Sequence, residues 1–149
     1  PFDSESFDTV IMSDIVEHLS PPQLAMALSE VRRVLRPGGK LLIHTMPNLW
    51  YYRFGYPVYR LAMLLKGATL PADPRQRYEY SHVHINEQTP CALRRTLKQS
   101  GFHDYRVWLS DYRQYEDQGR LMQFVLKNLT TCAITKHVFC DDIFAIARR

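Results

Sequence analysis

Acidic and imidazole side chains gather at two places in this chain. Asp14, Glu17 and His18 follow an apolar, β-branched stretch, and His82 and His84 lie much further along. A neutral imidazole can accept a proton near neutral pH, so His18, His82 and His84 are candidate general bases toward a hydroxyl, an amine or a carbon acid. Two carboxylates and two imidazoles could instead bind an ion such as magnesium or manganese. Each histidine also has a structural interpretation, in which its ring only bridges a loop to a helix or caps one.

A second group of candidate site residues is aromatic. The crowded residues are Trp50, Tyr51, Tyr52, Phe54, Tyr56 and Tyr59. Tyrosine and tryptophan give broad, rigid contact area with a polar tip, which suits an organic ring or a sugar. We therefore expect substrate contacts from Asn48, Trp50 and Tyr51, and from Tyr80 further along. The alternative is a small satellite core cluster.

Local patterns predict the elements that position these side chains. Residues 7–13 are typical of a strand covered on both faces. The run from Ser20 to Gln23 predicts a helix start with a capping box, and apolar residues then recur at helical spacing up to Leu35. Pro37-Gly-Gly39 should end the helix, and residues 41–43 should form a second buried strand. Such a βαβ unit forces the two strands to be parallel.

The segment from about 49 to 81 interrupts this alternation. It begins with the aromatic cluster, continues with a short helix over 61–65 and ends in an irregular loop over 68–77. It is too long for an ordinary strand-to-helix connection, and such excursions are usually lids or binding loops. We predict a lid or substrate-cap insertion over about residues 49–81.

The remaining residues predict two helices and two strands. Asn86 or Thr89 should cap a helix that has Leu93 and Leu97 on its inner face and ends at Gly101. A half-buried strand should then run over 105–109, a second helix over 121–129 and a last buried strand over 143–147. Four strands with intervening helices make an α/β fold. At 149 residues the chain fits one domain.

Three short motifs in this order resemble a known family. They are Asp14-Ile-Val-Glu-His18, Arg36-Pro-Gly-Gly39 and Met46-Pro-Asn48. Together they resemble the second half of a class I S-adenosylmethionine-dependent methyltransferase of the type 11 group. The resemblance implies a partial Rossmann-like sheet, strands four to seven with the last antiparallel, over residues 1–149. It also implies S-adenosylmethionine as the cofactor.

The resemblance also implies roles for particular residues. In that family the cofactor lies across the C-terminal strand ends, so Ser13, Asp14 and Ile15 are expected to line its methionine and sulfonium end. A carboxylate beside a sulfonium cation is favourable in a partly dry cleft. The alternative is that Asp14 only turns the chain. His18, His82 or His84 would assist deprotonation if the acceptor requires it.

The family's glycine-rich cofactor loop lies upstream of the segment that this chain resembles. We therefore expect cofactor binding to need upstream residues, and we expect those residues or a partner chain to cover the hydrophobic edge beside the first strand. One alternative function is a non-catalytic remnant or pairing module of the same fold. Another, less favoured, is a metal-assisted methyltransferase of RNA 3′ ends, because Asp14, Glu17 and His18 with His82 or His84 resemble its ligand set. Asp14 stands where that family has a glutamate, and no metal is expected.

Composition narrows the partners. The net charge of +4 comes from scattered bases rather than a dense stripe, so no nucleic-acid partner is expected. No apolar run approaches bilayer-spanning length, and Cys91, Cys132 and Cys140 show no paired-ligand spacing, which favours reduced thiols in a cytoplasmic protein. The tryptophan, tyrosines, arginines and short apolar helix within 49–81 are also typical of a membrane interface. A peripheral membrane contact and a lipid- or glycan-linked acceptor therefore stay open beside a small-molecule acceptor.

Overall fold

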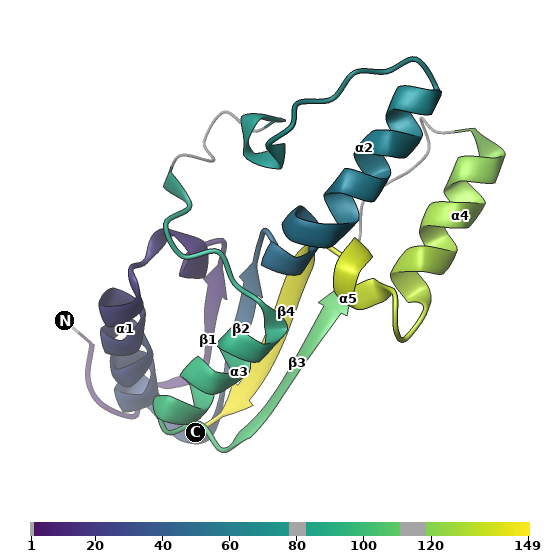
Figure 1. Cartoon of the computed structure of the whole chain (residues 1–149). Helices are drawn as coiled ribbons and strands as arrows, with labels where there is room; N and C mark the ends of the chain where they lie inside the picture. Colours follow the sequence, from purple (N-terminus) through teal and green to yellow (C-terminus); the bar gives the residue numbers. More distant parts are fainter. Residues whose placement is uncertain (1, 78–82, 111–118) are drawn as a thin grey trace.

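The computed structural model describes residues 2–77, 83–110 and 119–149. Its centre is a four-stranded sheet made of β1 (Phe7–Ser13), β2 (Leu35–Thr45), β3 (Asp104–Ser110) and β4 (Asp142–Arg148). The strand order is β1-β2-β4-β3 (Figure 1). Strands β1 and β2 are parallel, whereas β4 is antiparallel to both of its neighbours. The predicted α/β sheet with an antiparallel last strand is confirmed.

The helices form two groups around this sheet (Figure 1). Helices α1 (Pro21–Val34) and α3 (Pro90–Gln99) cover one face. Beyond the C-terminal ends of β1 and β2 lie α2 (Tyr56–Leu65), α4 (Arg120–Thr131) and α5 (Lys136–Phe139). Short helical turns complete the chain: η1 (Val16–His18), η2 (Tyr51–Gly55) and η3 (Pro74–Arg77).

The ends of α1 and α3 follow from their sequences. At the start of α1, the Gln23 side chain accepts a hydrogen bond from the Ser20 backbone N–H at 2.9 Å, as the capping box predicts. Thr89 caps α3 by accepting from the Ala92 N–H at 3.1 Å. Gly101 ends that helix with a φ of +82°, a conformation that glycine adopts without a steric penalty.

The predicted turn at Pro37-Gly-Gly39 is wrong in one respect. Helix α1 already ends at Val34, and β2 begins at Leu35, so these three residues lie inside the strand. The pairing of β2 with β1 shifts register here, and Gly38 has a φ of +80°. The glycines therefore permit a bulge in β2 rather than a separate turn.

The main core lies between the sheet and the two helices on its covered face. Its buried side chains include Val16, Leu24, Leu28, Leu41, Leu93, Leu97, Phe102, Val107, Leu109 and Ile143. The predicted inner faces of α1, α3 and β3 are thus confirmed. Strand β1 departs from its prediction, because only Met12 is buried and Ile11 is 66% exposed. Among the described residues β1 pairs only with β2, and the helices cover one face of the sheet.

The excursion after β2 is more ordered than a loop. Helix α2 begins at Tyr56, earlier than the predicted 61–65. Tyr51, Tyr52 and Tyr56 form a second buried cluster, and the Tyr56 hydroxyl donates to the Pro71 carbonyl at 2.8 Å. A Cβ atom at Gly55 would overlap the carbonyl oxygen of Val138, so η2 packs closely against α5.

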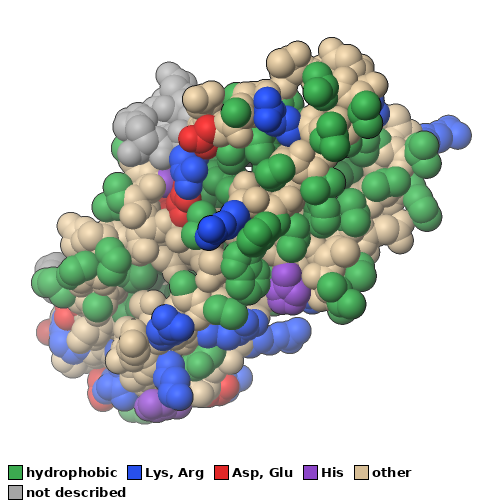
Figure 2. Space-filling view, in the orientation of Figure 1, with side chains coloured by type: hydrophobic (Ala, Val, Ile, Leu, Met, Phe, Trp, Pro, Cys, Tyr) green, Lys and Arg blue, Asp and Glu red, His purple; other side chains and the backbone are tan. Residues whose placement is uncertain are grey.

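The surface over α2 and α4 carries many apolar side chains (Figure 2). Within the described segments, no helix has the length and apolar character needed to cross a membrane.

Candidate active site

Asp14 begins the candidate site at the C-terminal end of β1. It has a φ of +53°, which is uncommon for a residue other than glycine but tolerated by aspartate. Its N–H donates to the His44 carbonyl at 3.0 Å, which continues the pairing of β1 with β2. Its carboxylate accepts from the Ser13 hydroxyl at 2.9 Å. The backbone therefore fixes Asp14 at the sheet edge with a half-exposed charge.

His44 lies between two carboxylates at this edge. Its Nδ1 is 3.0 Å from Asp14 Oδ1, and its Nε2 is 3.0 Å from Asp142 Oδ1. Burial opposes the charge of His44, but the hydrogen bond with Asp142 and the attraction of Asp14 outweigh it and raise the pKa of His44 above its ordinary value. We call Asp14, His44 and Asp142 the carboxylate–imidazolium bridge. A protonated ring donates to both carboxylates and holds Asp14 in place.

A second polar group lies beside Thr45, the residue of β2 that follows His44. It consists of Glu17, His18 and His84, and we call it the Glu–His–His group. Glu17 is buried and accepts a hydrogen bond from the Thr45 hydroxyl at 2.6 Å. His18 Nε2 lies 4.0 Å from Glu17 Oε1, and the rings of His18 and His84 have centroids 4.8 Å apart. The structure thus brings together two of the three predicted bases and adds Glu17. The third, His82, lies outside the described residues, as does Tyr80.

The two histidines of this group have different surroundings. His18 is exposed, and its Nδ1 lies 3.2 Å from the Val83 carbonyl. His84 is partly buried, and its Nδ1 has no hydrogen-bond partner among the described residues. Burial and the neighbouring His18 lower the pKa of His84 below its ordinary value. Both effects favour the neutral form of the His84 ring, which can accept a proton.

The same group could hold a metal ion. Glu17, His18 and His84 each offer a ligand atom, and these atoms lie within 4.8 Å of one another. A carboxylate and two imidazoles suit a transition metal such as manganese or zinc. Asp14, which belonged to the ligand set considered from the sequence, contacts His44 instead.

The segment after residue 82 is fastened over η1. The Asn86 N–H donates to the Glu17 carbonyl at 3.0 Å, and its side-chain amide donates to the Val16 carbonyl at 3.3 Å. Leu49 N–H donates to the Gln88 carbonyl at 2.8 Å, which joins the same segment to the chain leaving β2. These bonds hold His84 against His18.

The predicted substrate residues have mixed placements. Asn48 is fully buried, and its amide nitrogen donates to the carbonyls of His137 at 3.0 Å and Cys140 at 2.9 Å. Tyr51 is buried in the tyrosine cluster, which was the alternative considered from the sequence. Trp50 is half-buried, with its ring centroid 6.0 Å from that of His137. Asn48 therefore joins the chain after β2 to α5 and the residue that follows it, whereas Tyr51 contacts the other tyrosines of its cluster. A direct contact of either residue with an acceptor stays a prediction.

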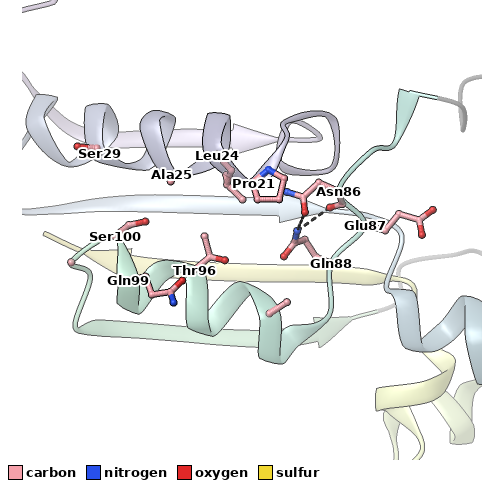
Figure 3. A pocket seen from close by; sticks show the side chains of 12 residues that line it. Pro21, Leu24, Ala25, Ser29, Asn86, Glu87, Gln88, Thr96, Gln99 and Ser100 are labelled. Atoms are coloured by element: carbon pink, nitrogen blue, oxygen red, sulfur yellow. Dashed lines mark hydrogen bonds between the residues drawn. The ribbon is translucent and has the colours of Figure 1, made fainter.

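A groove of about 580 Å³ lies on the helix-covered face, between α1 and α3 (Figure 3). Asn86, Glu87 and Gln88 line one end of it, and the Gln88 amide donates to Asn86 Oδ1 at 2.8 Å. Neither Asp14 nor His18 is among its lining residues. We therefore identify the candidate site from the two side-chain groups at the strand ends and not from this groove.

Sequence reasoning missed His44 and Asp142. A polar residue at the end of a predicted buried strand was the available signal for His44, because strand ends carry site residues in α/β folds. Asp142 gave no such signal, because it stands just before the predicted last strand over 143–147. It reaches His44 only through the pairing of β2 with β4.

Known proteins resemble parts of this chain. Residues 1–43 match the family described as a methyltransferase domain. A demethylmenaquinone methyltransferase of Clavibacter sepedonicus is 34% identical over 87 residues, which are 57% of this chain and 35% of that protein. One from Staphylococcus aureus is 29% identical over 110 residues, or 72% of this chain and 45% of that protein. The chain thus spans less than half the length of these relatives.

A solved structure covers the whole chain. Phosphoethanolamine N-methyltransferase 2 of Haemonchus contortus, in complex with S-adenosyl-L-methionine, superposes with a TM-score of 0.59 at 18% identity. The alignment covers 100% of this chain and 34% of that one. At this identity the likeness concerns the fold. Residues 1–43 therefore resemble a methyltransferase domain, and the fold of the whole chain resembles part of an N-methyltransferase that binds S-adenosyl-L-methionine.

Proposed function

We propose that the chain serves S-adenosylmethionine-dependent methyl transfer to a small-molecule acceptor. The observation that carries this proposal is the pair of polar groups at the C-terminal ends of β1 and β2, where α/β sheets place their ligands. The related demethylmenaquinone methyltransferases are named for a small-molecule acceptor, which supports the acceptor class. Within the same proposal, the acceptor group could be carried on a lipid or a glycan.

Asp14 and its neighbours fit one end of the cofactor. The Asp14 carboxylate is half exposed and is held by Ser13 and His44, so a fixed negative charge faces outward beside the exposed Ile15. Such a charge suits a sulfonium cation. Among the six glycines of this chain no two have a single residue between them, so these residues contain no Gly-x-Gly cofactor loop. Upstream residues would hold the rest of the cofactor.

When bound, the cofactor would supply an electrophilic methyl group for in-line attack by the acceptor. The chain's own residues would position the acceptor, exclude water and accept a proton where the acceptor carries one. His84 Nδ1 is the best-placed acceptor of that proton, because it is partly buried, neutral and without a partner among the described residues. His18 would orient His84 through their ring contact.

The division of the chain follows from this proposal. Residues 1–149 would form the C-terminal part of a methyltransferase domain, and about 49–81 would cap the acceptor. Trp50 is the best-exposed candidate contact of that cap among Asn48, Trp50 and Tyr51.

Calorimetric titration with S-adenosylhomocysteine tests the proposal. It is applied to residues 1–149 and to a version extended upstream, each beside its Asp14→Asn variant. Binding by the extended version that weakens at least several-fold in Asp14→Asn is expected. Lack of binding by both lengths contradicts the proposal and favours a non-catalytic pairing module. If the extended version binds S-adenosylhomocysteine equally well with and without Asp14→Asn, only the role assigned to Asp14 is contradicted.

A further inference from the structure

Helices α2 and α4 lie side by side beyond the strand ends (Figure 1). An apolar groove of about 460 Å³ lies between them. Its lining comes from both helices and from α5: Val58, Tyr59, Ala62, Leu121, Met122, Val125, Leu126, Leu129 and Phe139. The methyl-transfer site uses none of these residues. The groove is therefore a separate feature of the molecule.

The outer surface of the two helices is also apolar. Leu61, Leu64 and Leu65 on α2, and Leu121 and Phe124 on α4, are between 57% and 83% exposed. A helix on the surface of a globular protein normally turns polar side chains outward, so a patch of large apolar side chains indicates an interaction surface. Figure 2 shows apolar side chains gathered over this part of the molecule.

Within residues 56–72 and 119–140, which contain the two helices, the side chains of Asp, Glu, Lys and Arg have a single sign. Residues 56–72 and 119–140 contain no aspartate or glutamate, although the chain has 15 acidic residues. They contain five lysine or arginine residues: Arg60, Lys66, Arg120, Lys127 and Lys136. Exposed leucine and phenylalanine ringed by cations match the headgroup and acyl layers of an anionic bilayer. A second copy of this chain would place like charges against each other.

We propose that α2 and α4 form a docking surface for a membrane that contains anionic lipids. The helices would lie in the plane of the interface, with Leu61, Leu65 and Phe124 among the acyl chains and the lysines at the headgroups. The two helices lie beyond the C-terminal end of β1 (Figure 1), and Asp14 directly follows that strand. A membrane-borne acceptor would therefore meet the molecule on the side of its candidate site. The docking surface itself does not depend on methyl transfer.

Vesicle flotation of the 149-residue chain tests this proposal. Vesicles of phosphatidylcholine alone are compared with vesicles that also contain phosphatidylglycerol. We expect at least several-fold more protein on the anionic vesicles, and less at high salt. Leu121→Ser with Phe124→Ser, and separately Lys66→Gln with Lys127→Gln, should each reduce retention several-fold. Circular dichroism verifies that each variant is folded, as expected for exposed positions.

The matched controls are Met26→Ser on α1 and Lys98→Gln on α3, which are exposed on the other helix layer and should leave retention unchanged. Equal retention on both vesicle types, retention on neither, or retention insensitive to the α2 and α4 substitutions overturns the proposal. Sedimentation equilibrium without lipid supplies another decisive outcome. Self-association that Leu121→Ser and Phe124→Ser abolish would assign the surface to a second copy and would overturn the membrane assignment.

Discussion

The two polar groups at the strand ends contain histidines with opposite electrostatic environments. His44 lies between two carboxylates, and its pKa is raised. His84 lies beside another imidazole in a partly buried position, and its pKa is lowered. The comparison teaches that one edge of a sheet can favour the charged form of one imidazole and the neutral form of another. The groups differ because of their neighbours and not because of residue type.

The largest expected effect comes from breaking the carboxylate–imidazolium bridge. His44→Leu removes the positive partner of the buried Asp142, so we expect the free energy of unfolding to fall by about 2–3 kcal/mol. Urea denaturation at neutral pH measures this loss. The double variant His44→Leu with Asp142→Asn should recover part of it, because a neutral amide then replaces the buried carboxylate that lost its imidazole. A double variant as unstable as His44→Leu alone would contradict this account.

The next effect concerns catalysis by the Glu–His–His group. In the upstream-extended protein, His84→Ala should lower kcat about 100-fold, in the range given for a lost general base. His18→Ala should lower it less, since His18 only contacts the ring of His84. Methyl transfer to a pool of small-molecule acceptors, followed by radiolabel from the cofactor, measures both. A larger loss in His18→Ala than in His84→Ala would reverse the two assignments.

A smaller effect should follow from loosening Glu17. Thr45→Val removes the hydroxyl that donates to this buried carboxylate, which should cost about 1–2 kcal/mol of unfolding free energy. Thr45→Ser keeps the donor and serves as the matched control. Chemical denaturation of both variants is the measurement, and equal stability of the two would show that the hydrogen bond contributes nothing measurable.

The comparison also predicts opposite pH dependences of stability. His44 has a raised pKa in the folded chain, so its stabilisation is complete below its ordinary pKa of about 6.5 and is lost as pH rises through the folded pKa. His84 has a lowered pKa, so its contribution is complete above about 6.5 and falls as the pH drops toward the folded pKa. Unfolding free energies measured from below to above about pH 6.5 test this. His44→Gln should lack the loss of stability with rising pH, and His84→Gln should lack the loss of stability with falling pH. Two variants with the same pH profile as the parent chain would contradict the assignment.

The smallest expected effect is that of metal removal. Asp14 contacts His44 rather than completing the Glu–His–His group, so we expect no metal requirement. Chelation of divalent ions should leave the activity of the extended protein within about twofold, because Asp14, the further ligand of the set considered from the sequence, is engaged by His44. Loss of activity that manganese restores would instead assign the group as a metal centre.

The sequence predicted the helix-covered layer well because its signals are local. The capping box at Ser20, the inner face of α3 at Leu93 and Leu97, and the stop at Gly101 each depend on neighbouring residues. The antiparallel last strand came from the family resemblance. The position of Asp14 at the strand end followed from the same local pattern.

The contacts that define the site could not be predicted in this way. His44 and Asp142 are separated by 98 positions and meet only through the pairing of β2 with β4. Asn48 is buried because its amide donates to carbonyls of His137 and Cys140. These residues are distant in the sequence, so the residues around Asn48 do not predict the contact. Tyr51 shows the same limit, because an aromatic cluster can fold on itself or face a ligand with identical local spacing.

The close approach of Gly55 to Val138 has a consequence for how an acceptor would enter. Because the root of the excursion is clamped to α5, we expect α2 to stay fixed while the substrate exchanges. Entry would then depend on the chain beyond Lys66, where Arg75 forms an ion pair with the largely buried carboxylate of Glu87. Opening of the Arg75–Glu87 pair, rather than movement of the tyrosine cluster, would then control entry of the acceptor.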